Sequence, residues 1–371
     1  MGFLFNLRQR KRGGVKFKTI QAARAVAVNA VMLSHLLIVE QKDGHGFTFL
    51  PEWSHLGACG VDLFFVLSGF IMATVASRES WRDFLLARAT RILPLYWFYS
   101  GVVLIVSLIA PGSVNSSFSH PSSVWRSVLL IPDTVDPLLA VGWTLTHEAY
   151  FYLVFAALLA TGYVRIASLC AWAAVLLTAR LMLPIAPTQE ATPVLAVVLH
   201  PLTLEFIGGA CAGLATRSGV TMRAVLAFIV GAVALIGCLG STENPSQLVL
   251  THTAQWGRVF KIGFPFVLMV YGLATTETTL GADALPNWVV RLGDASYSTY
   301  LTHVLVLSAV GRCLAFVPVH NFAIEVFFVA LCITGANAIG LLSYRLLERP
   351  TLIFSRRAFG RGEQANTATA R

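Results

Sequence analysis

An arginine and a histidine lie eleven positions apart within one apolar stretch near the start of the chain. These residues are Arg24 and His35, in the stretch 20–39. Because an α-helix turns by about 100° per residue, eleven residues bring both side chains to one face, about 16 Å apart along the helix axis. A guanidinium and an imidazole are costly to bury in a segment of bilayer length. We therefore expect both to line a functional cavity.

Three further clusters of ionisable residues fall within apolar stretches. Asp62 lies in GVDLFFVLSGF, His147 and Glu148 lie in GWTLTHEAYFY, and His303 lies in YSTYLTH. An imidazole beside a carboxylate is a general-base pair, because the carboxylate fixes the tautomer and stabilises the imidazolium. Either Glu148 or Asp62 is predicted to orient His35, and the sequence leaves this choice open. His303 either belongs to the same site or forms a hydrogen bond to a neighbouring helix.

Two other kinds of chemistry find little support in the sequence. Ser68 precedes Gly69, but no G-x-S-x-G elbow surrounds it, so a nucleophilic role for its hydroxyl is disfavoured. The six cysteines lie in or beside apolar stretches without the spacing of metal ligands, and we expect no metal site. Gly69, Gly208 and Gly209 are instead predicted to let helices approach closely.

The composition identifies the elements that must position these residues. Hydrophobic residues make up 56% of the 371 residues and charged residues 12%, and the mean hydropathy is +0.71. These values are typical of an all-α polytopic membrane protein, in which about 20 apolar residues form each span. The prediction is a bundle of about ten transmembrane helices, near 20–39, 57–76, 92–110, 138–160, 166–183, 197–216, 224–240, 258–275, 293–311 and 322–344.

The distribution of Lys and Arg predicts the orientation of this bundle. Twenty of them flank the spans on one side, whereas only Lys42, Arg126, Arg258 and Arg312 fall on the other. Since cations favour the cytoplasmic side, both termini are expected in the cytoplasm. Basic tails, 1–18 and 351–371, then flank one membrane domain, 19–350. The net charge of +9 is explained by this topology and by contact with anionic lipid, without a nucleic-acid partner.

The segment between the second and third spans carries a row of arginines. It reads SRESWRDFLLARATRILP, and residues 80–91 are predicted to form an amphipathic helix at the membrane interface that ends before Pro94. Arg88 and Arg91 are three positions apart and so share a face, with Arg82 and Arg78 close to the same stripe. This row either binds phosphate groups or anchors the helix at lipid headgroups.

Seven segments in order give the chain a resemblance to acyltransferase family 3. The family comprises membrane enzymes that O-acylate bacterial surface polysaccharides, lipopolysaccharide, Nod factors and some antibiotics. The resemblance covers Thr19 to Pro350 and includes the basic residue, ten positions and histidine of the first span. The other similar segments are GVDLFFVLSGF, FLLARATRILPLYW, GWTLTHEAYFY, LEFIGGACAGL, SYSTYLTH and YRLLERP.

The resemblance implies a reaction and assigns roles to residues. The enzyme would move an acyl group, acetyl being expected over succinyl, from cytoplasmic acyl-CoA to a sugar hydroxyl of an exopolysaccharide or its lipid-linked precursor. It would lie in the bacterial inner membrane, hold no bound cofactor, and work beside polysaccharide assembly proteins. The implied catalytic residues are His35, Glu148 and Asp62, the acyl-CoA-binding residues are Arg24, Arg88 and Arg91, and the supporting residues are His303, Ser68 and Tyr297.

Two other functions stay open on the sequence alone. A transporter or flippase of a glycolipid intermediate would use Arg24, His35 and Glu148 as a proton relay. A structural subunit of a polysaccharide assembly complex would tolerate the loss of His35. Release of free CoA from acyl-CoA separates the enzyme from both.

Overall fold

The computed structural model describes residues 17–44, 48–75, 79–110, 123–162, 164–182, 192–219, 223–242, 256–281, 285–317 and 321–358. Over these ranges every regular element is a helix. Six helical segments of the described chain are long and apolar enough to cross a membrane, and two further apolar helices are shorter. The prediction of an all-α, multi-pass membrane protein is therefore confirmed, whereas the number of about ten crossings and the cytoplasmic position of both termini stay predictions.

Each predicted apolar stretch contains a helix in the structure. These ten helices are α2 (Lys18–Asp43), α3 (Gly60–Val75), α4 (Trp81–Ile109), α6 (Gly142–Ala160), α7 (Ile166–Met182), α9 (Leu202–Arg217), α10 (Ala224–Gly240), α13 (Phe264–Leu280), α15 (Ser296–Ala315) and α16 (Phe322–Ser343). Short elements join them or extend their ends. These are η1 (Glu52–Cys59), α5 (Val124–Val128), α8 (Pro193–Val198), α12 (Trp256–Arg258), η4 (Val259–Gly263), α14 (Asn287–Asp294), η5 (Tyr344–Glu348) and α17 (Arg349–Ala358).

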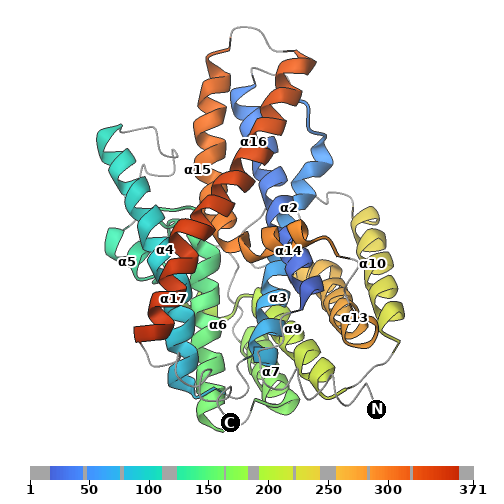
Figure 1. Ribbon diagram of the computed structural model, residues 1–371. Coiled ribbons are helices and arrows are strands. Elements are labelled where there is room, and N and C mark those ends of the chain that lie inside the picture. The colour runs from blue at the N-terminus through green and yellow to red at the C-terminus, as the bar shows by residue number, and fades with distance from the viewer. Residues whose placement is uncertain are drawn as a thin grey trace, which may run out of the picture.

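Helix α2 occupies the middle of the bundle. Figure 1 shows α4, α6 and α17 on one side of it and α10 and α13 on the other, while α15 and α16 form an antiparallel pair beside its C-terminal half. The carboxylate of Glu277 caps its first turn, accepting hydrogen bonds from the backbone N–H groups of Lys18 and Thr19 at 2.9 and 2.8 Å. A carboxylate at a helix N-terminus satisfies unpaired N–H groups and complements the helix dipole. The helix that carries Arg24 and His35 is thus held at its start.

Two glycines allow α3 and α9 to cross in direct backbone contact. A Cβ atom on Gly69 would overlap the carbonyl oxygen of Phe206, and one on Gly209 would overlap that of Val66. No residue with a side chain fits at either position without separating the helices. The predicted role of these glycines in close helix packing is confirmed.

Aromatic rings fill the space between this helix pair and α6. The ring of Phe151 lies 5.3 Å from that of Phe65 on α3 and 4.7 Å from that of Phe206 on α9, measured between centroids. Phe151 and Phe206 are fully buried. Ring pairs at these separations add to the free energy gained by burying their area. Phe151 therefore packs α6 against both α3 and α9 near the middle of the helix.

The predicted end of the interfacial helix before Pro94 is wrong. Residues 81–109 form one continuous helix, α4, with Pro94 in its interior. Proline removes one backbone hydrogen bond without ending the helix here. Close to it, the hydroxyl of Tyr297 donates to the carbonyl oxygen of Ile92 at 2.8 Å and joins α4 to α15. The helix begins at Ser80, whose Oγ accepts a hydrogen bond from the backbone N–H of Asp83. Arg82, Arg88 and Arg91 thus belong to the same continuous helix as the third predicted span.

Candidate functional site

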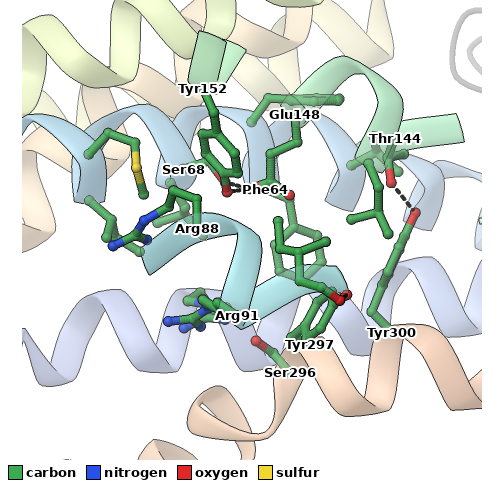
Figure 2. A pocket seen from close by; sticks show the side chains of 18 residues that line it. Phe64, Ser68, Arg88, Arg91, Thr144, Glu148, Tyr152, Ser296, Tyr297 and Tyr300 are labelled. Atoms are coloured by element: carbon green, nitrogen blue, oxygen red, sulfur yellow. Dashed lines mark hydrogen bonds between the residues drawn. The ribbon is translucent and has the colours of Figure 1, made fainter. Parts of the chain in front are cut away.

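A cavity lies between α2, α3, α4, α6 and the start of α15. Its empty space, with the open mouth included, is about 780 Å³. Figure 2 shows polar side chains from α3, α4, α6 and α15 converging on it. Six of the residues predicted from the sequence line it, namely Arg24, Ser68, Arg88, Arg91, Glu148 and Tyr297. Five segments far apart in the chain therefore meet at one site.

The cavity is rich in guanidinium groups. Arg24, Arg88 and Arg91 line it together with a single carboxylate, Glu148. The Nε atom of Arg88 is buried and makes no hydrogen bond within the described residues. An unused buried N–H on a cation is a favourable site for a phosphate oxygen. The structure thus favours phosphate binding over lipid anchoring for this part of the arginine row.

The rest of the arginine row lies away from the cavity. Arg82 is exposed, with its guanidinium 5.1 Å from the centroid of the Trp81 ring. Arg78 falls outside the described residues. The helical repeat explains the division, because Arg88 and Arg91 share a face one turn apart while Arg82 lies at the exposed start of α4. Only the inner two arginines of the predicted row therefore reach the site.

Glu148 is held in the cavity by two hydroxyl groups. Its Oε1 atom accepts a hydrogen bond from Ser68 Oγ at 2.8 Å and another from the phenol of Tyr152. Figure 2 shows Tyr152 and Glu148 reaching the cavity from the same face of α6. The hydroxyl of Ser68 thus orients a carboxylate, a contact that the sequence did not predict. Tyr152, one helical turn after Glu148, was not singled out from the sequence.

His35 is paired with a second histidine. Its Nδ1 atom lies 2.9 Å from Nε2 of His303, and the two rings are nearly parallel, at 5°. The Nδ1 atom of His303 lies 2.7 Å from the carbonyl oxygen of Tyr300. A carbonyl can only accept, so this Nδ1 carries the hydrogen, and Nε2 of a neutral His303 must accept from Nδ1 of His35. The hydrogen-bond network therefore places the lone pair of a neutral His35 on its Nε2 atom.

This arrangement answers the open choice of a partner for His35. The sequence offered Glu148 or Asp62, whereas in the structure the hydrogen-bonded partner of Nδ1 is the fully buried His303. A carbonyl, a first imidazole and a second imidazole form a chain that fixes a tautomer, as a carboxylate would. The chain holds His35 in the tautomer that a general base requires.

The histidine pair lies next to the cavity rather than in its lining. Arg24 lines the cavity, and His35 and His303 do not. Tyr300 joins the two regions, since it lines the cavity and its ring lies 5.7 Å from that of His303. The expectation that Arg24 and His35 line one cavity thus holds for Arg24 alone.

The segment SYSTYLTH connects α15 to three neighbouring elements. Besides the bond from Tyr297 to α4, Ser298 donates to Glu348 of η5 at 2.6 Å, and the hydroxyls of Tyr300 and Thr144 lie 2.9 Å apart. These contacts point in different directions from the first turns of α15, where every residue from Ser296 to His303 is buried. The segment therefore sets the position of His303 relative to α4 and α6.

Asp62 takes part in a different contact from the predicted one. Both of its oxygens accept hydrogen bonds from Arg258, from Nε and Nη2, each at 2.7 Å. Asp62 is fully buried and Arg258 is 8% exposed. Glu205 is also buried in this region, against η4. The geometry assigns Asp62 to a buried ion pair that joins α3 to α12, and Arg258, expected in an outer connection, is an interior residue.

His147 and Glu148 are neighbours in sequence but lie in separate places. Glu148 lines the cavity described above, whereas His147 lines a second one with Trp143 and Thr146. Consecutive residues of a helix point about 100° apart, so α6 forms a wall between the two cavities. The predicted cluster of His147 with Glu148 is therefore divided by the helix that carries both.

Comparisons with known proteins agree with these features. The Acyltransferase domain family profile matches residues 17–340. The exopolysaccharide production protein ExoZ of Rhizobium meliloti (strain 1021) is 32% identical over 327 residues, which cover 84% of this chain and 92% of that protein. The acyltransferase MdmB of Streptomyces mycarofaciens is 26% identical over 331 residues, 79% of each chain. No solved structure matches significantly.

Proposed function

This chain belongs to the Acyltransferase domain family and is a multi-pass membrane acyltransferase, and from that premise we propose that it carries an acyl group from cytoplasmic acyl-CoA to a sugar hydroxyl. The acyl group proposed is acetyl, and the acceptor is an exopolysaccharide or its lipid-linked precursor. The name of the relative ExoZ supports this class of acceptor. The proposed location is the bacterial inner membrane, with both termini in the cytoplasm and polysaccharide assembly proteins nearby.

The observation that carries the donor assignment is the cavity with three arginines. Acyl-CoA is a polyanion, and guanidinium groups bind phosphate oxygens in pairs. In this proposal Arg24, Arg88 and Arg91 hold the phosphates, and the pantetheine arm extends along α2. The separation of Arg24 and His35, about 16 Å at 1.5 Å per residue, is one that an extended pantetheine arm bridges.

The chemistry follows from the tautomer of His35. Its Nε2 atom removes the proton from the acceptor hydroxyl as the oxygen attacks the thioester carbonyl carbon. The carbon–sulfur bond then breaks, and the CoA thiolate takes the proton from the imidazolium, so that an ester and free CoA are formed. His303 stabilises the imidazolium by accepting from Nδ1. In this proposal Glu148, fixed by Ser68 and Tyr152, balances the charge of the arginines beside it.

Asp62 and Tyr297 have positioning roles in the proposal. Asp62 holds Arg258 within the interior and thereby fixes α3 against α12. Tyr297 fixes α15 against α4 at the proline turn. Neither residue need contact the thioester or the sugar. Loss of Tyr297 is expected to act through the helices that carry Arg88 and His303, and loss of Asp62 through the position of α3, which carries Ser68.

The decisive experiment measures release of CoA by the purified protein in lipid nanodiscs. We expect acetyl-CoA and an oligosaccharide of the de-O-acylated surface polysaccharide to yield free CoA and an O-acetylated sugar. His35→Ala should abolish both products, while Trp53→Ala, at an exposed position outside both cavities, should leave them unchanged. A transporter or a structural subunit would release no CoA. Full activity of His35→Ala would refute the assigned base.

A further inference from the structure

The second cavity lies on the far side of α6 from the arginines. It is bounded by residues 126–137, the first turns of α6, and α8 with the following His200. The sequence places the connection that contains 126–137 on the outer side of the membrane. A ligand that enters from outside the cell would therefore meet this cavity, whereas one from the cytoplasm would meet the arginines.

The walls of the second cavity are fixed by hydrogen bonds. Ser127 accepts a bond at its Oγ from the N–H of Leu138 at 2.7 Å, and its carbonyl accepts one from the Tyr96 hydroxyl at 2.8 Å. The indole N–H of Trp97 donates to the carbonyl oxygen of Val128 at 2.8 Å. These bonds tie Ser127 and Val128 to α4 and to Leu138, which lies four residues before the start of α6. The cavity is thus a built feature of the fold and not a gap beside a loose loop.

The imidazole of His147 in this cavity has a ring nitrogen without a hydrogen-bond partner among the described residues. His147 is 7% exposed, lines the cavity, and its Nδ1 atom has no partner within the described residues. Its ring lies 4.6 Å from that of His200 and 5.7 Å from that of Trp143. Buried polar atoms are nearly always satisfied, so this one indicates a ligand group that completes it.

The remaining lining suits a neutral, hydroxyl-rich molecule. Asp133 is paired with Arg126 at 3.3 Å, so its charge is balanced, and Asp136 supplies a second carboxylate. Trp143 offers an indole beside apolar side chains. A pyranose ring has this same division, with apolar C–H faces that pack on aromatic rings and hydroxyls that bond to carboxylates and imidazoles. A polyanion finds three arginines in the first cavity but only one, already paired, in this one.

We infer that the second cavity binds a saccharide unit of the acceptor glycan. This inference rests on the proposed function and deepens it by giving the acceptor a place. Trp143 packs against a sugar face, and His147, Asp133 and Asp136 bind hydroxyls. The neighbouring Thr144 contacts Tyr300, which in turn contacts His303. Thr144 itself lines the first cavity, so these contacts run from the first turn of α6, which borders both cavities, to the histidine pair.

The test measures binding of sugar and donor separately. Fluorophore-labelled oligosaccharides from the de-O-acylated surface polysaccharide are titrated with the protein in nanodiscs and followed by anisotropy. We expect Trp143→Ala and His147→Phe each to raise the Kd for the oligosaccharide by about tenfold or more, the loss typical of a removed buried contact. Trp53→Ala, a tryptophan outside the cavity, serves as the matched control and should bind like the wild type.

Binding of CoA shows whether each variant is folded. Trp143→Ala and His147→Phe should bind CoA as the wild type does, because the first cavity is on the other side of α6. Unchanged oligosaccharide affinity in both variants, or an absence of oligosaccharide binding by the wild type, would overturn the inference. Failure of the proposed function is seen separately, as an absence of CoA release from acyl-CoA by the wild-type protein.

Discussion

If His35 is the base, as proposed, its pairing with His303 predicts that His303 is replaceable only by another hydrogen-bond acceptor. In the wild type, Nε2 of the fully buried His303 accepts a hydrogen bond from Nδ1–H of His35 at 2.9 Å. In His303→Leu, this N–H group loses its acceptor. An unsatisfied buried donor costs about 1–3 kcal/mol, which corresponds to about a 5- to 150-fold loss of rate if it is felt at the transition state. In His303→Gln, the side-chain oxygen takes the place of Nε2 and accepts the same bond.

The assay compares the two variants by their rates of CoA release at saturating acetyl-CoA and acceptor. We expect His303→Gln to stay within about fivefold of the wild type and His303→Leu to fall well below it. Thermal unfolding of both variants controls for damage to the fold. Equal rates for the leucine and glutamine variants, with both folded, would show that His303 does not set the tautomer of His35, and the reasoning would be refuted.

Three further predictions concern the residues around the site. Arg88→Ala should raise the Kd for CoA by about tenfold while Arg82→Ala leaves it unchanged, as measured by isothermal titration, because a single charge-assisted bond contributes on this scale. Removing one partner of the buried ion pair, in Asp62→Asn or Arg258→Met, should lower the free energy of unfolding by about 3–5 kcal/mol, and the double variant should recover part of this loss in SDS unfolding. Gly69→Val should reduce the yield of folded protein in size-exclusion chromatography, since a side chain there overlaps the facing backbone, and normal yield would contradict the close crossing of α3 and α9.

The sequence predicts the helices well because burial in lipid demands long apolar runs, and such runs are visible without a fold. The sequence also predicts that Arg88 and Arg91 share one helical face, because this relation depends only on the helical repeat. The close helix contact at Gly69 is predicted for a similar reason, because a glycine within an apolar helix is typical of a place where two helices approach closely.

The sequence does not predict which residues of distant segments pair with one another. Asp62 and Arg258 are 196 positions apart, and Arg258 is at the edge of an apolar stretch, where a cation looks like part of a connection. His303 is 268 positions from His35, so its choice as partner over a carboxylate depends on how α15 packs against α2. The bond from Tyr297 to the carbonyl oxygen of Ile92 likewise joins residues 205 positions apart. No local pattern encodes these pairings.

The position of α6 as the wall between two cavities has a consequence for how such enzymes diversify. In the proposed function, donor and acceptor bind on different faces of one helix, so residues such as Trp143 and His147 can change while Glu148 and Tyr152 stay fixed. Natural variation in the segment 126–137 can then give a new sugar preference without a new thioester chemistry. Related enzymes that share one donor and serve unlike surface polymers are expected to differ mainly on that outer face.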